Sequence, residues 1–304
     1  MEHHTDLTTK QPILLITGMH RSGTSFVAGL LQSAGLDIGK NLLEANYSNP
    51  KGFFENTDFL DFHRSVLSSL GIEPKGWIVP DEIIVPDEYV SKAKQLIKHN
   101  ASAVKPWGWK EPRTTIFLNF WSNLLPNAKF LFIYRSPWEV IDSLYRRGDR
   151  PFYDVPEFAL EIWTAYNQKI LNFRLQYPEK CLLVNLNSIT KNTHTLIKNI
   201  QKKFSIFLDL PNLEVYDSSL LKNYKNYDSA HPYIIKEFFP QVFNLYNRLN
   251  KIADLMEEEE FNLEPDVISN RFLRDWIEMR YRERKAQTKI DQLQAEIKNL
   301  KQFK

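Results

Sequence analysis

Short apolar runs alternate with amphipathic segments over the first two thirds of the chain. The runs are rich in β-branched and aromatic residues and comprise Ile13–Thr17, Ala103–Lys110, Lys129–Tyr134 and Cys181–Leu186. Between them, apolar residues recur with the period of a helix, as in the segment that Gly35 closes. Fully apolar strands that alternate with helices are typical of a parallel sheet covered on both faces. The pattern therefore predicts an α/β fold, with a parallel sheet flanked by helices.

Two segments that contain prolines interrupt this alternation. They are Glu73–Pro86 and Gly148–Pro156, and helices are predicted on either side of the first, over Thr57–Leu70 and Asp87–His99. We expect both proline-containing segments to be loops, which either shape an acceptor pocket or connect helices at the surface.

The pattern from His231 onward is helical throughout, so a helical C-terminal region follows the sheet. Near the end, one frame with 3-4-3 spacing collects Trp276, Met279, Ala286, Ile290, Leu293, Ile297 and Leu300, with Glu283 as an interruption. Two alternatives remain: a helix packed on its own domain, or an extended helix that pairs with a second copy or another partner as a coiled coil. We favour the second. The expected parts are a disordered tail (1–11), the α/β domain (12–230), its helical part (231–273) and the extended helix (274–304).

The composition is that of a globular chain with a sizeable core. Of the 304 residues, 43% are hydrophobic and 25% charged, and the net charge is +2. So small a net charge predicts no nucleic-acid partner. The single cysteine excludes a disulfide framework and a cysteine-rich metal site. No apolar segment reaches the ~18 residues of a membrane-spanning helix. Residues 1–11 lack the apolar centre of a signal peptide, so we expect a cytoplasmic protein.

A tight loop follows the first predicted strand. The sequence Gly-Met-His-Arg-Ser-Gly-Thr-Ser, Gly18–Ser25, leads from the strand into the start of a helix. Its backbone N–H groups and the helix N-terminus favour an anion, Gly23 lets the backbone approach it, and the hydroxyl groups of Thr24 and Ser25 can donate to it. The spacing resembles the nucleotide-binding P-loop. However, Thr24 stands where that loop has lysine, and Arg21 supplies the positive charge instead.

The absence of the P-loop lysine at Thr24 affects which type of enzyme is expected. A kinase or nucleoside triphosphatase needs that lysine, magnesium and normally an acidic residue at a strand end. The predicted strands end instead in neutral or basic residues, namely Thr17, Lys110, Arg135 and Asn185–Asn187. We therefore expect no metal site, and we keep a P-loop kinase that uses ATP and magnesium as an alternative.

A second strand-to-helix segment carries Arg135 and, eight positions later, Ser143. Ser136 and Glu139 predict a capping box, and Pro137 suits the first helical position. Arg135 then lies at the carboxyl end of a parallel strand, where ligand crevices open in α/β folds. Together with Ser143 it can bind a phosphate. The two segments thus predict a ligand with two separated anionic ends.

These residues carry a resemblance to a known family. Gly18–Ser25 resembles the 5′-phosphosulfate loop of sulfotransferases that use 3′-phosphoadenosine 5′-phosphosulfate (PAPS), and Arg135 with Ser143 resembles their 3′-phosphate element. The sequences Asn-Pro-Lys-Gly-Phe-Phe-Glu55 and Trp-Gly-Trp-Lys-Glu-Pro-Arg113 are similar to bacterial members. The resemblance covers about Pro12 to Ile189, and two motifs in order at the right separation make it specific.

The resemblance implies an enzyme that moves a sulfuryl group from PAPS to a hydroxyl or amine, and we expect a carbohydrate or glycolipid acceptor. It also implies the residues that bind the donor, which are Gly18, His20, Arg21, Ser22, Gly23, Thr24, Ser25, Arg135 and Ser143. Because the sulfuryl group carries less charge than a terminal phosphate, arginine and lysine can take the place of magnesium.

Catalytic roles follow from the same resemblance. Arg21 is expected against the bridging oxygen of the donor, and Lys110 resembles the strand-end lysine that contacts the sulfuryl group. Glu55 is the favoured general base, and Glu111 and His63 are the alternatives. Plainer interpretations remain: Lys110 as a surface lysine, Glu55 as a salt-bridge partner, and His63 as a core histidine.

Other residues are weaker candidates. Arg113 either binds the donor or the acceptor, or pairs with Glu111, and Trp77 is a candidate for stacking on a ring. The Arg-Lys-Gly loop that closes the donor site in many relatives is absent, and Lys222, Lys225 or the helix from residue 231 are its expected substitutes. A non-catalytic scaffold that keeps the nucleotide pocket is the third alternative for the whole protein.

Overall fold

The computed structural model describes residues 11–44, 52–211, 230–256 and 265–302. The chain divides into two compact units. One unit comprises Met1–Lys222 and Gln241–Glu258, and the other comprises Asn223–Pro240 and Glu259–Lys304. Lys222, Lys225 and the expected N-terminal tail, apart from Gln11, lie outside the described residues.

Four parallel strands form the sheet of the first unit, in the order β2-β1-β3-β4. Their bounds are Ile13–Thr17 (β1), Trp107–Lys110 (β2), Lys129–Tyr134 (β3) and Cys181–Asn185 (β4). The predicted parallel sheet is confirmed, and β1 and β3 have the predicted ends. The second strand starts at Trp107 rather than Ala103, because Pro106 lacks the N–H that a ladder needs.

Alternating residues of the strands face opposite layers of helices. Leu14 and Ile16 share one apolar cluster with Leu131. The helices that complete this cluster are α1 (Thr24–Ser33), α8 (Leu186–Lys191) and α9 (Thr193–Phe204). Lys110 pairs in register with Ile16, so its side chain projects to the α1 side.

The other face of the sheet is covered largely by aromatic side chains. Trp109 stacks on Phe59 with ring centroids 3.8 Å apart, and Phe130 contacts Phe173 at 5.0 Å. The covering helices are α2 (Thr57–Ser69), α4 (Leu118–Leu124) and α7 (Phe158–Gln176). Such close stacking of buried rings contributes much of the apolar area that holds this layer in place.

The strand order creates a crevice at the carboxyl ends of β1 and β3. The chain leaves β1 toward β2 on one side, whereas β3 continues to β4 on the other. Connections that depart in opposite directions leave an opening between them, which is where α/β sheets bind ligands. The two predicted anion-binding segments follow these two strands.

The remaining helices of the first unit are α3 (Asp87–Asn100), η1 (Pro112–Phe117), α5 (Pro137–Arg147), α6 (Arg150–Asp154), η2 (Pro178–Lys180) and α11 (Pro240–Ile252). The prediction that Gly148–Pro156 is a loop is wrong in part, since it contains α6. Pro151 is tolerated in the first turn of α6, and burial of Phe152 against Trp77 stabilises the turn.

The prediction of an entirely helical region from His231 onward is also wrong in one place. The structure has α10 (His231–Phe238), α11 and α12 (Pro265–Gln302), but Leu255 forms a parallel bridge with Val184. The Asp254 carboxylate accepts a 2.9 Å hydrogen bond from the Leu183 N–H. This contact to β4 outweighs the local helical pattern. No helix in the described ranges is long and apolar enough to cross a membrane.

Candidate active site

The loop between β1 and α1 folds tightly around two glycines. Gly18 has a φ of +154°, and a Cβ there would lie 2.1 Å from the Ile133 carbonyl oxygen. Gly23, with a φ of +88°, immediately precedes α1. The head of α1 therefore opens at the carboxyl end of β1, where its first N–H groups and its dipole favour an anion.

Arg21 connects this loop with the second predicted segment. Its Nε donates a 2.9 Å hydrogen bond to Oγ of Ser143 in α5, across 122 positions of the chain. Arg21 also adopts a left-handed backbone conformation, with a φ of +68°. The two anion-binding segments therefore meet at one place.

Positive charge is concentrated around Arg21. Burial, together with the nearby guanidinium groups of Arg147, Arg135 and Arg146, lowers the pKa of Arg21 to about 10. At the rim, two acids pair with the outer arginines: Asp142 with Arg146 and Asp149 with Arg147. Guanidinium groups that disfavour one another's charge create a positive potential that a bound anion relieves. This potential suits an anionic ligand.

Arg135, just after β3, is held by Glu139. Its Nη2 lies 2.9 Å from Oε1 of Glu139, and Ser136 Oγ donates to Oε2 at 2.5 Å. The predicted capping box is therefore wrong, because Glu139 binds these side chains and Ser136 makes no side-chain cap. Pro137 begins the helix as predicted. A charge-assisted hydrogen bond is stronger than a neutral cap, which explains the preference.

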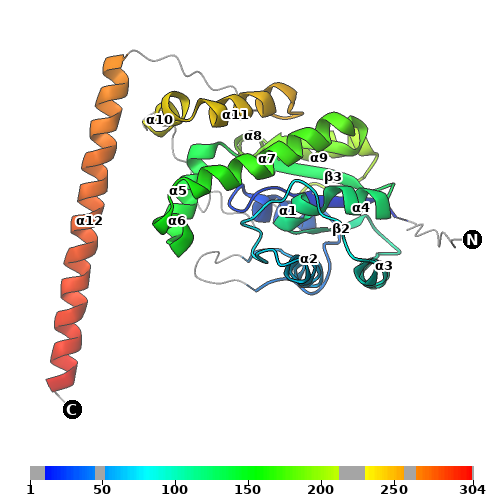
Figure 1. Ribbon diagram of the computed structural model, residues 1–304, viewed down its shortest axis with the longest axis horizontal. Helices are drawn as coiled ribbons and strands as arrows, with labels where there is room; N and C mark the ends of the chain where they lie inside the picture. Colours follow the sequence, from blue (N-terminus) through cyan, green and yellow to red (C-terminus); the bar gives the residue numbers. More distant parts are fainter. Residues whose placement is uncertain (1–10, 45–51, 212–229, 257–264, 303–304) are drawn as a thin grey trace, which may run out of the picture. The chain divides into compact units, whose positions relative to one another are not determined.

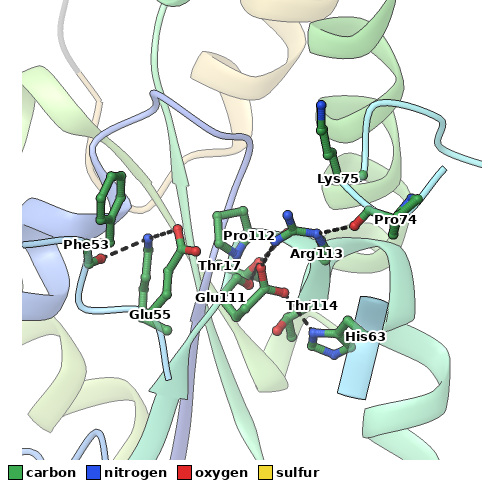
Figure 2. A network of polar contacts seen from close by, with 12 residues as sticks. Thr17, Phe53, Glu55, His63, Pro74, Lys75, Glu111, Pro112, Arg113 and Thr114 are labelled. Carbon is green, nitrogen blue, oxygen red and sulfur yellow. Dashed lines mark hydrogen bonds and ion pairs between the residues drawn. The ribbon is translucent and has the colours of Figure 1, made fainter. Parts of the chain in front are cut away.

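Lys110 and Glu55 form a buried ion pair at the end of β2. The Lys110 ammonium donates to Ser25 Oγ at 3.2 Å, and also to Glu55 Oε1 at 2.8 Å and the Phe53 carbonyl at 3.1 Å, which are both labelled in Figure 2. Lys110 is 1% exposed. Its three protons are thus all used, whereas Oε2 of Glu55 has no hydrogen-bond partner among the described residues. One carboxylate oxygen is left open beside the head of α1.

Glu111, the next residue, belongs to a second buried network (Figure 2). Its Oε2 binds Nδ1 of His63 at 2.7 Å, and its Oε1 accepts from Nη1 of Arg113 at 2.5 Å. Nε1 of Trp121 donates to Nε2 of His63 at 2.8 Å. An indole N–H can only donate, so Nε2 accepts and the imidazole proton is on Nδ1. Both nitrogens of a neutral His63 and both oxygens of Glu111 are therefore engaged.

The charges of this network follow from its environment. Burial lowers the pKa of His63 and outweighs the opposing hydrogen bond to Glu111. For Glu111, burial opposes ionisation, but the Arg113 charge and the His63 hydrogen bond outweigh it and lower the pKa. The network thus holds a neutral imidazole, a carboxylate and a guanidinium.

Arg113 also connects the network to the proline-containing loop after α2. Its Nε donates to the Pro74 carbonyl at 2.9 Å, and Tyr166 Oη donates to the Gly76 carbonyl at 2.9 Å. These two bonds fix a loop that has no helix or strand of its own within the described part. The two bonds therefore hold the part of the loop that carries Trp77, which forms a wall of the site.

His20 lies where this wall meets the first loop. Its ring centroid is 5.0 Å from that of Trp77, which Phe152 and Arg147 also contact. Nε2 of His20 and Oγ of Ser22 are buried and have no hydrogen-bond partner among the described residues. Burial, followed by the Arg113 charge, holds the pKa of His20 well below its ordinary value. Buried polar atoms without partners are rare, and here they leave hydrogen bonds available to a ligand.

The structure gathers the predicted residues into three neighbouring groups. The first is the loop after β1 with the start of α5: Gly18, His20, Arg21, Ser22, Gly23, Thr24, Ser25, Arg135 and Ser143. The second is Glu55 with Lys110, and the third is His63, Glu111 and Arg113, with Trp77 against His20. The helix expected to close the donor site, α10, belongs to the other unit.

Two residues of the site have roles that the sequence does not predict. Glu139 was expected only as a cap, although its spacing of four residues from Arg135 on a helix could have indicated the ion pair. Tyr166 lies within α7, where no motif or spacing marks it.

Comparison with solved structures finds matches at low sequence identity and with TM-scores below 0.5. A sulfotransferase of Mycobacterium avium is 13% identical, with a TM-score of 0.49, over 84% of this chain and 80% of that chain. A sulfotransferase of Mycobacterium tuberculosis is 13% identical, with a TM-score of 0.45, over 82% and 79%. The sulfotransferase domain of the Synechococcus olefin synthase is 18% identical, with a TM-score of 0.42, over 88% and 96%. A comparison with curated proteins finds no match.

The family is shown by a family model rather than by these structures. The model of the sulfotransferase family matches residues 12–209, which is well over half of the chain. The match includes the sheet, the loop after β1 and the residues gathered around Lys110 and Arg135. The chain therefore belongs to the sulfotransferase family.

Proposed function

We propose that this protein transfers a sulfuryl group from PAPS to a hydroxyl group of its acceptor, with carbohydrates and glycolipids as the expected acceptor class. Membership of the family gives the type of reaction. The observation that best supports PAPS as the donor is the 2.9 Å hydrogen bond between Arg21 and Ser143. It joins the loop expected for the 5′-phosphosulfate to the segment expected for the 3′-phosphate.

The residues present suit such a donor. The arginines around Arg21 leave a positive potential, and His20 Nε2 and Ser22 Oγ have hydrogen-bonding capacity to spare. Gly18 and Gly23 have positive φ, and a Cβ at either would meet Ile133 or Leu186, so glycine is what lets the loop fold this tightly before α1. When bound, PAPS supplies a sulfuryl group whose bond to the 5′-phosphate oxygen breaks as the acceptor oxygen bonds to sulfur.

Arg21 and Lys110 are proposed to neutralise charge during the transfer. Transfer of this kind is in-line and loose, so the protein mostly positions groups and stabilises charge. Lys110 is held between Ser25 at the head of α1 and Glu55. These bonds fix its positive charge beside the head of α1, where the sulfuryl group is expected, while Arg21 is proposed to face the charge that develops on the leaving phosphate.

Glu55 is the base that the hydrogen bonds favour. His63 and Glu111 have no ring nitrogen or carboxylate oxygen left for an acceptor. Oε2 of Glu55 is open among the described residues, and it lies on the carboxylate that Lys110 orients. We propose that this carboxylate receives the proton of the acceptor hydroxyl.

Glu111 and Arg113 are proposed to position the acceptor side rather than to react. They fix the loop that carries Trp77 through the bond from Arg113 to Pro74. Trp77 is 7% exposed, so we assign it to the wall of the site and not to stacking on a sugar ring.

The donor assignment is tested by calorimetry. Adenosine 3′,5′-bisphosphate is titrated without metal into the wild type, Arg135→Ala and a matched control, Arg150→Ala, whose side chain is 89% exposed. We expect metal-free binding to the wild type and the control, and a loss of binding in Arg135→Ala. Binding of ATP with magnesium but not of the bisphosphate would overturn the proposal in favour of a kinase.

The base is tested by turnover. With labelled PAPS and a panel of carbohydrate acceptors, Glu55→Gln should bind the bisphosphate normally and lose turnover about 10²–10⁴-fold, the usual contribution of a general base. Glu82→Gln, on an exposed loop, serves as the control. Tight donor binding without sulfation of any acceptor would favour the non-catalytic scaffold.

A further inference from the structure

The second unit ends in α12, an unbroken helix of 38 residues (Figure 1). This is about three times the mean length of an α-helix, and at 1.5 Å per residue it measures about 57 Å. Large apolar side chains on it are exposed, with fractions of 46% for Ile290, 44% for Leu293 and 52% for Ile297. An apolar stripe on a polar helix indicates a surface that another molecule covers.

The stripe follows positions a and d of a heptad. The helix begins at Pro265, ahead of the predicted start at residue 274, and the frame extends back to Phe272. The successive positions are Phe272, Trp276, Met279, Glu283, Ala286, Ile290, Leu293, Ile297 and Leu300. Only one of them, Glu283, is polar. Four heptads with a single interruption are enough to indicate a coiled coil.

The contacts of α12 within its unit lie off the seam that positions a and d form. The Asp275 carboxylate accepts a 2.8 Å hydrogen bond from the Ala230 N–H, and the Arg271 guanidinium lies 6.0 Å from the Tyr233 ring centroid. Arg271 and Asp275 occupy positions c and g. The segment around α10 thus fastens the base of α12 and leaves positions a and d to a partner.

We propose that α12 pairs with α12 of a second copy of this chain in a parallel, in-register, two-stranded coiled coil. The residue types favour this partner. Ile290 and Ile297 occupy position a, and Leu293 and Leu300 occupy position d. β-branched residues at a with leucine at d favour two parallel strands over trimers and tetramers.

The flanking charges are compatible with the same pairing. In a parallel dimer, each g residue faces the e residue of the next heptad on the other copy. The facing pairs would be Asp275 with Arg280, Arg282 with Gln287, Lys289 with Gln294, and Glu296 with Lys301. Two pairs are opposite in charge and none is alike. Self-pairing in this register therefore meets no repulsion at its flanks.

Glu283 is the weak point of the seam, because two carboxylates face each other at position a. Arg280 lies 2.7 Å from Glu283 on the same helix and offsets part of this repulsion. Replacing Glu283 by an apolar residue should therefore strengthen the dimer, whereas a charge at another position of the seam should break it.

The association is tested by the mass of the full chain in solution. By light scattering and sedimentation, we expect the wild type to have twice the chain mass of 35.9 kDa. Ile290→Asp should be a monomer at the same concentration, whereas Thr288→Asp, which places the same charge at position f, should remain a dimer. A monomeric wild type, or a dimeric Ile290→Asp, would overturn the proposal.

Glu283→Leu guards against a result that reflects misfolding alone. Replacing the acid by an apolar side chain should lower the dissociation constant at least tenfold, a gain that a misfolded variant cannot produce. If Ile290→Asp binds the bisphosphate as the wild type does, the first unit, which holds the sheet, is folded in this variant. A Glu283→Leu variant that associates no more tightly than the wild type would contradict burial of position 283 in a seam.

The parallel orientation is tested by oxidation. Leu293→Cys should form an intermolecular disulfide rapidly, since equal d positions face each other in register, and Thr288→Cys should not. The natural cysteine, Cys181, is buried, and burial raises the pKa of its thiol to about 12, so the wild type is an unreactive control. A dimer in which Leu293→Cys fails to crosslink would exclude the parallel arrangement.

Discussion

Lys110 and Glu111 are neighbours in the chain, yet they belong to charged clusters of different kind. Lys110 projects to the α1 side of the sheet and pairs with Glu55, which keeps one carboxylate oxygen without a partner among the described residues. Glu111 projects away from it, and both of its oxygens are bound, to His63 and Arg113. A buried cluster with hydrogen-bonding capacity left over can take a ligand, whereas a saturated one holds its surroundings in place.

The comparison gives a criterion for telling catalytic residues from structural ones when both are buried and charged. Burial does not distinguish the clusters, since Lys110 is 1% and Glu111 0% exposed. The hydrogen-bonding capacity that remains does distinguish them. Breaking either buried pair should cost stability, but we expect only substitutions around Lys110 to lower turnover beyond that loss.

The largest expected effect is on turnover. Lys110→Met keeps the length of the side chain and removes its charge, so kcat should fall about 10²–10³-fold, as when one donor to a transition state is removed. The dissociation constant of adenosine 3′,5′-bisphosphate, measured by calorimetry, should change far less. Lys98→Met, on the exposed side of α3, is the control. Equal losses in turnover and in affinity would remove the distinction between the two clusters.

The next effect is on folding. Glu111→Gln keeps the shape of the side chain but leaves the Arg113 guanidinium buried without its carboxylate. The free energy of unfolding in urea should fall by about 3 kcal/mol, the cost of breaking a buried ion pair on one side. Glu82→Gln should change it little. A Glu111→Gln variant as stable as the wild type but inactive would place Glu111 in the chemistry.

The stability difference between the wild type and Glu111→Gln should depend on pH. Although burial opposes ionisation, Arg113 and His63 lower the pKa of Glu111 from 4.5 to about 2. A carboxyl with a lower pKa in the folded state stabilises fully above pH 4.5, and its contribution is lost as the pH falls toward 2. The stability difference between wild type and Glu111→Gln should thus be constant from neutral pH down to pH 5 and shrink below it. A difference that grows on acidification would contradict the ionised state of Glu111.

The smallest expected effect concerns the contact between the two anion-binding segments. Ser143→Ala removes the acceptor of the Arg21 Nε hydrogen bond and frees the guanidinium to move. Bisphosphate affinity should weaken about tenfold, the effect of one hydrogen bond to a charged group. Ser91→Ala, on the exposed surface of α3, should bind as the wild type does. Unchanged affinity in Ser143→Ala would show that the contact does not order the donor site.

Much of the sheet and of the donor side was predictable from the sequence. The apolar runs gave β1 and β3 their correct ends, because a buried parallel strand needs a continuous apolar segment. That the loop after β1 and the segment after β3 lie at one edge of the sheet was predictable as well, since parallel strands present their carboxyl ends together, but the direct bond between Arg21 and Ser143 was not predicted. The apolar runs are local sequence patterns, and the shared edge follows from the order and direction of the strands.

The acceptor side was less predictable because tertiary contacts decide it. Tyr166 binds a carbonyl in a loop 90 positions away, and no spacing in α7 indicates this. Likewise, Ser136 and Glu139 match a capping box in sequence, but the Arg135 guanidinium nearby takes the carboxylate instead. A sequence pattern predicts a hydrogen-bond partner nearby in the chain, but a charged group that the fold brings close can take the place of that partner.

The left-handed backbone at Arg21 has a consequence for engineering. At a φ of +68°, glycine would be free of steric strain, whereas arginine costs on the order of 1 kcal/mol. A redesign guided by thermal stability alone would thus select glycine at position 21 and remove the positive charge that faces the crevice. Heat tolerance and sulfation are expected to move in opposite directions at this residue, so a screen for one cannot substitute for a screen for the other.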